Sequence, residues 1–144
     1  MGGPSLMFRA GAQLCALGLE YVVEVMRPLP VRRLEGTDAF LCGVSVVRGI
    51  PVPVISVATL LGGDGGYASR FVTVKGDRGP AALAVDAVLG VREIPAGAEH
   101  ELSPLFAGSR AQPVTALATL DAEVLVLLHH ARLVPDEVWA VLDR

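Results

Sequence analysis

The pattern of apolar residues, turns and acidic positions in the first half of the chain recurs in the second half. The matched segments are residues 6–11 with 72–77, 17–25 with 83–91, 44–49 with 117–122, and 52–61 with 125–134. This register places Glu20 over Asp86 and aligns two tight turns. Chance overlap of segments rich in valine and leucine is the alternative explanation. A recurrence of this length indicates tandem duplication of one supersecondary unit, so the fold should contain two similar halves.

Short segments rich in valine and leucine, separated by ten prolines and sixteen glycines, fill both halves. Segments bounded by such turn residues predict β-strands rather than helices of average length. The predicted strands are residues 12–19, 43–47, 50–57, 71–74, 81–85 and 124–128. We therefore predict a mainly β protein in which each half forms a small five-stranded β-barrel. Because a barrel of about 65 residues buries too little apolar surface to be stable alone, the two should share a hydrophobic core.

The last ten residues show a helical pattern instead of the strand pattern of the preceding segments. Pro135 followed by two acidic residues is typical of a helix start, and Val138, Val141 and Leu142 then recur at helical spacing. We expect a flexible leader over residues 1–5, one domain over residues 6–134 and a C-terminal helix over residues 135–144. The domain should consist of halves at about 6–66 and 70–134, with strands able to cross between them.

Charged residues make up only 19% of the chain and apolar residues 52%. So few charges suggest that a large fraction of the chain is buried, that some apolar surface is reserved for protein partners, or both, and we expect both. The net charge is −3, and Arg32 with Arg33 forms the only adjacent basic pair, so nucleic acid is not an expected partner. The longest apolar stretch, residues 50–61, is too short to span a bilayer. Without signal features at the start, we expect a cytoplasmic protein with no direct membrane insertion.

Motifs for catalysis or cofactor binding are not found in the sequence. Residues 43–47 lack the second glycine of a nucleophile elbow, and no glycine cluster precedes the Lys-Ser/Thr of a phosphate-binding loop. His129 and His130 invite a metal hypothesis, but adjacent strand residues point to opposite faces and should not share one ion. We therefore predict a non-catalytic protein with no cofactor, no catalytic residue and no metal site. The alternatives are a small-ligand or metal-binding β module and a protein that self-assembles through its sheet edges.

Arg48 is the residue that physical reasoning singles out. It follows Val44 and Val46 on one face of a predicted strand and directly precedes Gly49 at a turn. A long cation at the rim of an apolar face is typical of a protein interface. The alternative is a solvated turn arginine. We predict a partner-binding role for Arg48.

Several segments, taken in order, resemble the CheW-type chemotaxis coupling proteins. The resemblance implies a fold of two five-stranded SH3-like β-barrels sharing a core, with a short C-terminal helix. It also implies a non-catalytic adaptor that links the cytoplasmic tip of a chemoreceptor to the regulatory domain of a CheA-type histidine kinase. The resemblance covers residues 6–143, and the segments that carry it are 22–25, 31–34, 39–44, 47–55, 84–91, 120–121 and 124–133.

The resemblance also implies a set of partner-binding residues. The family usually has Asn-Leu where this chain has Val46 and Val47, and an acid where it has Ser56 and His129. These departures imply a divergent member, serving a parallel pathway such as surface motility or pilus control. The partner-binding residues implied for kinase or receptor are Val22, Glu24, Gly43, Val44, Arg48, Gly49, Val88 and Val91.

Overall fold

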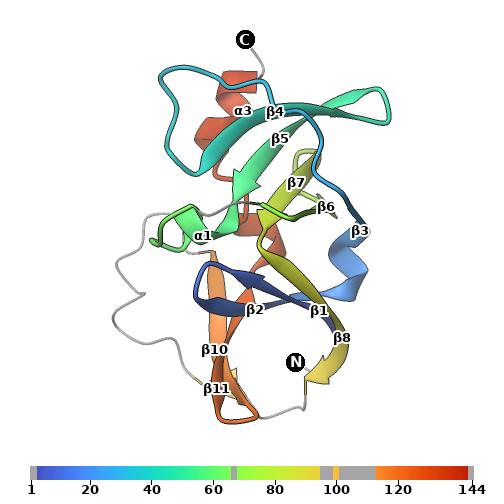
Figure 1. Ribbon diagram of the computed structural model, residues 1–144, viewed down its shortest axis with the longest axis vertical. Helices are drawn as coiled ribbons and strands as arrows, with labels where there is room; N and C mark the ends of the chain where they lie inside the picture. The colour runs from blue at the N-terminus through green and yellow to red at the C-terminus, as the bar shows by residue number, and fades with distance from the viewer. Residues whose placement is uncertain (1–2, 66–67, 95–98, 101–112, 143–144) are drawn as a thin grey trace.

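Two twisted β-sheets lie one above the other in the computed structural model, which describes residues 3–65, 68–94, 99–100 and 113–142 (Figure 1). Sheet A has the strand order β8 (Ala87–Ile94), β1 (Gly3–Ala10), β2 (Gln13–Gly18), β11 (Glu123–Leu128), β10 (Val114–Leu120) and β9 (Glu99–His100). Sheet B has the order β3 (Val22–Met26), β6 (Arg70–Lys75), β7 (Pro80–Val85), β5 (Ile50–Ser56) and β4 (Leu41–Val47). The short helices are η1 (Leu19–Tyr21), α1 (Val57–Leu60), η2 (His130–Arg132) and α3 (Asp136–Leu142).

The two sheets are built alike because the sequence repeat is a structural repeat. In the order of the repeat, β1, β2, β3, β4 and β5 correspond to β6, β7, β8, β10 and β11, and both sheets place corresponding strands in the same order. Each sheet combines a hairpin from one repeat with three strands from the other. Sheet A has β1 and β2 from the first repeat and β8, β10 and β11 from the second, whereas sheet B has β6 and β7 from the second repeat and β3, β4 and β5 from the first. A parallel pair joins the two contributions in each sheet, β2 with β11 and β5 with β7. Neither repeat therefore completes a sheet by itself.

The prediction of a mainly β fold with two five-stranded subdomains and a C-terminal helix is confirmed. All six predicted strands coincide with observed strands to within two residues. The two-residue strand β9 extends sheet A, and neither sheet closes into a barrel through its backbone ladder in the described residues.

The expectation of a flexible leader over residues 1–5 is wrong for residues 3–5. Strand β1 begins at Gly3, and Gly3, Pro4 and Ser5 pair with Ile94, Glu93 and Arg92 of β8. The glycines near the N-terminus make residues 3–5 look unstructured in the sequence. These residues nevertheless join sheet A, because β8 is long enough to pair with β1 as far as Gly3.

The apolar side chains form three clusters. Two small clusters fill the concave interiors of the sheets, one around Leu125 and Leu127 in sheet A and one around Phe71 and Val54 in sheet B. The third and largest cluster lies between the sheets and takes side chains from both, among them Phe8 and Leu83. This shared core explains how so short a chain buries enough apolar surface to be stable.

Helix α3 completes the shared core. Val138 is buried in that cluster, and Trp139 packs beside it, within van der Waals distance of where side chains at Gly76 and Gly79 would begin. None of the helices in the described part of the chain is long and apolar enough to cross a membrane.

Gly43 allows a close approach between β4 and the segment that precedes it. Arg32 and Val44 exchange two backbone hydrogen bonds of 2.8 and 2.9 Å. Gly43 has a φ of +145°, and a Cβ atom built there would lie 2.1 Å from the carbonyl oxygen of Arg32. Only glycine therefore fits at this position without moving the backbone.

Gly43→Ala should destabilise the protein strongly because the new methyl group would collide with backbone rather than with a flexible side chain. We expect a loss of about 3 kcal/mol or more in the free energy of unfolding, measured with urea. Gly36→Ala is the matched control, since Gly36 also has a positive φ, +74°, but has no atom within 4 Å of the added Cβ. It should lose only about 1 kcal/mol. Equal losses for the two variants would contradict the steric explanation.

Candidate functional site

The turn between β4 and β5 fixes the position of Arg48. Arg48 and Gly49 have φ angles of +50° and +81°, as in the two-residue hairpin turns whose twist matches that of the strands. The corresponding turn of the other repeat holds Asp121 and Ala122, with φ angles of +50° and +67°. The same strained backbone at matching positions supports the duplication and shows that Arg48 stands at the tip of a rigid hairpin.

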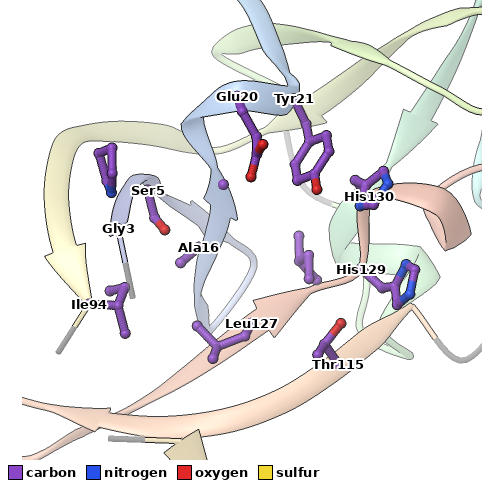
Figure 2. A pocket seen from close by; sticks show the side chains of 13 residues that line it. Gly3, Ser5, Ala16, Glu20, Tyr21, Ile94, Thr115, Leu127, His129 and His130 are labelled. Atoms are coloured by element: carbon purple, nitrogen blue, oxygen red, sulfur yellow. The ribbon is translucent and has the colours of Figure 1, made fainter. Parts of the chain in front are cut away.

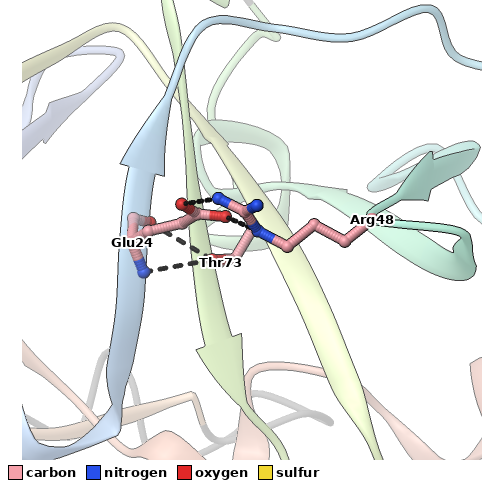
Figure 3. Close-up of polar contacts among 3 residues, drawn as sticks. All are labelled: Glu24, Arg48 and Thr73. Carbon is pink, nitrogen blue, oxygen red and sulfur yellow. Dashed lines mark hydrogen bonds and ion pairs between the residues drawn. The ribbon is translucent and has the colours of Figure 1, made fainter.

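Arg48 forms a two-pronged ion pair with Glu24 of β3 (Figure 3). Its Nε donates to Oε1 of Glu24 at 3.0 Å, and its Nη2 donates to Oε2 at 2.7 Å. This geometry fixes the plane of the guanidinium. The Arg48 side chain nevertheless remains 74% exposed, against 27% for Glu24. Arg48 is therefore held in one direction while much of its surface stays available to a partner.

The side chain of Thr73 on β6 forms hydrogen bonds with the backbone of Glu24. The register between β3 and β6 shifts between Val22 and Glu24, which interrupts the regular ladder. The Thr73 hydroxyl accepts a hydrogen bond from the amide of Glu24 at 3.1 Å and donates to its carbonyl oxygen at 3.3 Å (Figure 3). The side chain thus replaces backbone partners at an irregular point of the sheet. This explains why a hydroxyl is buried there, with only 6% of Thr73 exposed.

The hydrogen bonds between the two side chains shift both ionisation equilibria. The hydrogen bond from Arg48 holds the pKa of Glu24 below its ordinary value; partial burial opposes this, and the positive charge of Arg48 adds to the lowering. The hydrogen bond and the charge of Glu24 raise the pKa of Arg48. Both side chains are consequently charged at neutral pH.

The ion pair connects the two ends of sheet B. Strands β3 and β4 stand at opposite ends of the strand order, yet the turn after β4 reaches Glu24 on β3. Sheet A has a comparable contact with the polarity reversed, because Arg92 of β8 pairs with Asp121 of the β10–β11 turn at 3.0 Å. Each sheet is thus curled until its first strand, β3 or β8, meets the hairpin tip of β4–β5 or β10–β11 through charged side chains. The two hairpin tips present opposite charges, which makes the two halves chemically different.

Exposed apolar side chains occur on the strand that carries Glu24 and on the hairpin that carries Arg48. Val23 on β3 is 56% exposed and Val46 on β4 is 63% exposed, whereas the predicted residues Val22 and Val44 are half-buried. Sequence reasoning missed the exposed set, which consists of Val23, Val25, Val46 and Ile50. The sequence did contain a signal for these exposed residues. Side chains alternate between the two faces of a strand, so a residue next to a partly buried one points to the other face.

The predicted residues Val88 and Val91 lie on β8 in sheet A. Val88 packs against the shared core, while Val91 is 51% exposed next to Leu89, which is 55% exposed. The repeat places Leu89 and Val91 at the positions of Val23 and Val25. The predicted site therefore divides into two matching apolar edges on separate sheets, with the ion pair to Arg48 on one of them.

The two predicted glycines shape the backbone around the site. Gly43 admits the carbonyl of Arg32 against β4, and Gly49 supplies the second positive φ of the hairpin turn. Gly43 is buried, so its contribution is to the position of β4 rather than to a contact surface.

His129 and His130 do not point to opposite faces as the sequence analysis expects. They lie where β11 passes into η2, with ring centres 5.3 Å apart, and His130 stacks on Tyr21 at 3.7 Å. No group of three or more potential metal ligands occurs among the described residues. The chain turns into a helix at His129, so the alternation of a strand no longer applies.

Ser56 and His129, which stand where the family usually has an acid, occupy matching positions of the two repeats. Their side chains make equivalent hydrogen bonds. The hydroxyl of Ser56 accepts from the amide of Thr59 at 3.2 Å, and Nδ1 of His129 accepts from the amide of Ala131 at 3.2 Å. Each therefore caps the start of the short helix that follows its hairpin.

The comparisons with known proteins agree with this architecture. The family model described as CheW-like domain matches residues 4–138. The solved structure of scaffolding protein TtCheW from Thermoanaerobacter tengcongensis is similar, with a TM-score of 0.80, 24% sequence identity and 92% of each chain covered. No curated protein matches the chain. With almost its whole length matched by the family model, the chain belongs to the CheW-like domain family.

Proposed function

We propose that this protein is a non-catalytic scaffold that couples chemoreceptors to a CheA-type histidine kinase in chemotaxis-like signalling. The observation that carries the proposal is the family match over residues 4–138. The similar solved structure is itself described as a scaffolding protein. The surface supports this role, because an exposed arginine beside apolar side chains is the composition found at protein interfaces.

The two apolar edges give a scaffold two separate contact surfaces. The first edge consists of Val23 and Val25 with the hairpin tip at Arg48, and the second of Leu89 and Val91. We propose that the first edge binds the kinase regulatory domain and that the second contributes to contact with the receptor tip. Each contact is expected to be modest in affinity, with avidity in an assembly providing the rest.

The hairpin tip supports the interpretation of a divergent member. Val46, where the family usually has a polar residue, is one of the most exposed apolar side chains and lies two residues before Arg48. This makes the first edge more apolar and favours a cognate partner with a matching apolar surface. We propose that the protein serves a pathway parallel to swimming chemotaxis, such as surface motility or pilus control.

Arg48→Ala should weaken binding to the kinase regulatory domain by about tenfold, as expected for an arginine that anchors an interface. Stability should change little, because exposed ion pairs contribute little to folding. Binding is measured by isothermal titration calorimetry, and kinase control by autophosphorylation and co-sedimentation with receptor, kinase and this protein. Arg70→Ala, which removes an exposed arginine from β6 of the same sheet, is the control and should bind like the parent.

Two results would contradict the proposal at different levels. Equal binding by Arg48→Ala and the parent would remove Arg48 from the interface but leave the scaffold function intact. Kinase activity and co-sedimentation that do not depend on the protein, with any cognate receptor and kinase, would contradict the function itself.

The Arg48–Glu24 pair should make stability depend on pH in one direction. Because Arg48 lowers the pKa of Glu24, the carboxylate stabilises the folded state only where it is ionised. This stabilisation should be complete above about pH 5 and disappear as the pH falls through the lowered pKa. Urea unfolding of the parent and of Glu24→Gln over a pH series measures it. A difference between the two proteins that grows towards acidic pH would refute the assignment.

A further inference from the structure

The cap of η2 depends on the protonation state of His129. The amide of Ala131 donates to Nδ1 of the His129 ring at 3.2 Å, while the backbone amide of His129 donates to the carbonyl oxygen of Pro113 at 2.7 Å. A ring nitrogen of histidine accepts a hydrogen bond only when it carries no proton, so the cap requires a neutral ring. In the protonated ring both nitrogens are donors. No rotation of a protonated ring can therefore restore the cap.

The corresponding cap in the first repeat does not depend on a titrating group. The hydroxyl oxygen of Ser56 caps α1 by accepting a hydrogen bond from the amide of Thr59 at 3.2 Å. A hydroxyl keeps its acceptor lone pairs throughout the pH range in which histidine titrates. The two repeats thus have equivalent caps, and only the cap of the second repeat can be removed by a proton.

The surroundings of His129 favour the neutral ring at neutral pH. Partial burial is the main cause that lowers the pKa of His129, and the charges of Arg132 and His130 add to the lowering. The carboxylate of Asp77 and a hydrogen bond with the histidine's own backbone act in the opposite direction. An unfolded chain lacks the burial, so the folded protein takes up this proton at a lower pH than the unfolded one.

Protons from solvent can reach the ring. The two histidines are half-buried and line a pocket of about 490 Å³ at the end of sheet A, together with Glu20 and Tyr21 of η1 (Figure 2). Glu20 is exposed to water, and Lys75 donates to its main-chain oxygen at 3.5 Å, so a positive charge accompanies this carboxylate. The titratable or charged side chains around His129 are therefore Glu20, Tyr21, Lys75, Asp77, His130 and Arg132.

The capped segment connects the shared core to the strand of the first edge. After η2 the chain places Leu133 and Val134 in the shared core, followed by Val138 of α3. Within η2, His130 stacks on Tyr21, with ring centres 3.7 Å apart and ring planes 2° apart. Tyr21 is the last residue of η1 and directly precedes β3. The cap of η2 therefore stabilises a junction between the core and β3.

We propose that His129 is an acid-sensitive cap, whose protonation removes the hydrogen bond from Ala131 and makes the segment from η2 to α3 open more often. The proton adds to the lone pair of Nδ1, which leaves an N–H group of the ring facing the N–H group of Ala131. It also brings a positive charge close to Arg132 and to the ring of His130, whose centre is 5.3 Å away. The proposal does not rest on the proposed scaffold function.

Hydrogen–deuterium exchange of the full chain over a pH series, corrected for the intrinsic pH dependence of amide exchange, tests the proposal. The stabilisation by the cap should be complete above about pH 6.5 and disappear as the pH falls through the lowered pKa of His129. Opening at residues 131–134 should then become about fivefold more frequent, as expected for the loss of one helix cap. Helix α1, capped by Ser56, is the internal control and should not change.

Two variants identify the responsible ring. His129→Ser copies the cap of the first repeat into the second, so it should stay protected at neutral pH and lose the pH dependence. His130→Gln changes the neighbouring ring and should keep the pH dependence. A dependence that persists in His129→Ser, or that disappears only in His130→Gln, would overturn the proposal, as would an equal change in α1.

The ring of the parent protein provides a second test that needs no variant to fold. Two-bond ¹H–¹⁵N correlation spectra of the histidine side chains should show the proton of His129 on Nε2 and none on Nδ1 at neutral pH. The same spectra over a pH series should give His129 a pKa below the ordinary value of about 6.5. A proton on Nδ1 at neutral pH, or a pKa at or above the ordinary value, would refute the acid-sensitive cap.

Discussion

The apolar core between the two sheets holds the molecule together. Each sheet takes its first hairpin from one repeat and its other three corresponding strands from the other, so neither repeat can complete a sheet alone. The shared core contains buried side chains such as Phe8 from sheet A and Leu83 from sheet B. A small barrel would be marginal alone, but strand exchange and the common core make the pair one unit. The positions of both candidate partner edges depend on it.

Duplication followed by divergence accounts for the surface. Strands β3 and β8 lie at matching ends of the two sheets and carry matching exposed apolar residues, Val23 and Leu89 among them. The ion pairs that link these strands to the hairpin tips have opposite polarity, with Arg48 on one tip and Asp121 on the other. Two edges of similar shape and different charge suit a scaffold that must hold two different partners.

The sequence predicts the local features of this fold well and the long-range ones less well. Hairpins, turns and the final helix follow from apolar spacing and from residues such as Gly49, because these features are encoded within a few residues. The exchange of strands depends on the parallel pairing of β2 with β11, which no local pattern specifies. Arg48 was identifiable as a rim cation, but its contact with Glu24 joins opposite ends of a sheet. The exposure of Val23 was missed because strand valines are usually buried.

Hydrogen–deuterium exchange of the full chain, with and without the regulatory domain of the cognate kinase, tests the central claim that the first edge is a docking surface. The account predicts slower exchange on binding at residues 22–26 and 46–50, with the β10–β11 tip around Asp121 unchanged. Protection confined to the Asp121 tip, or a complex that leaves residues 22–26 and 46–50 exchanging as in the free protein, would contradict it.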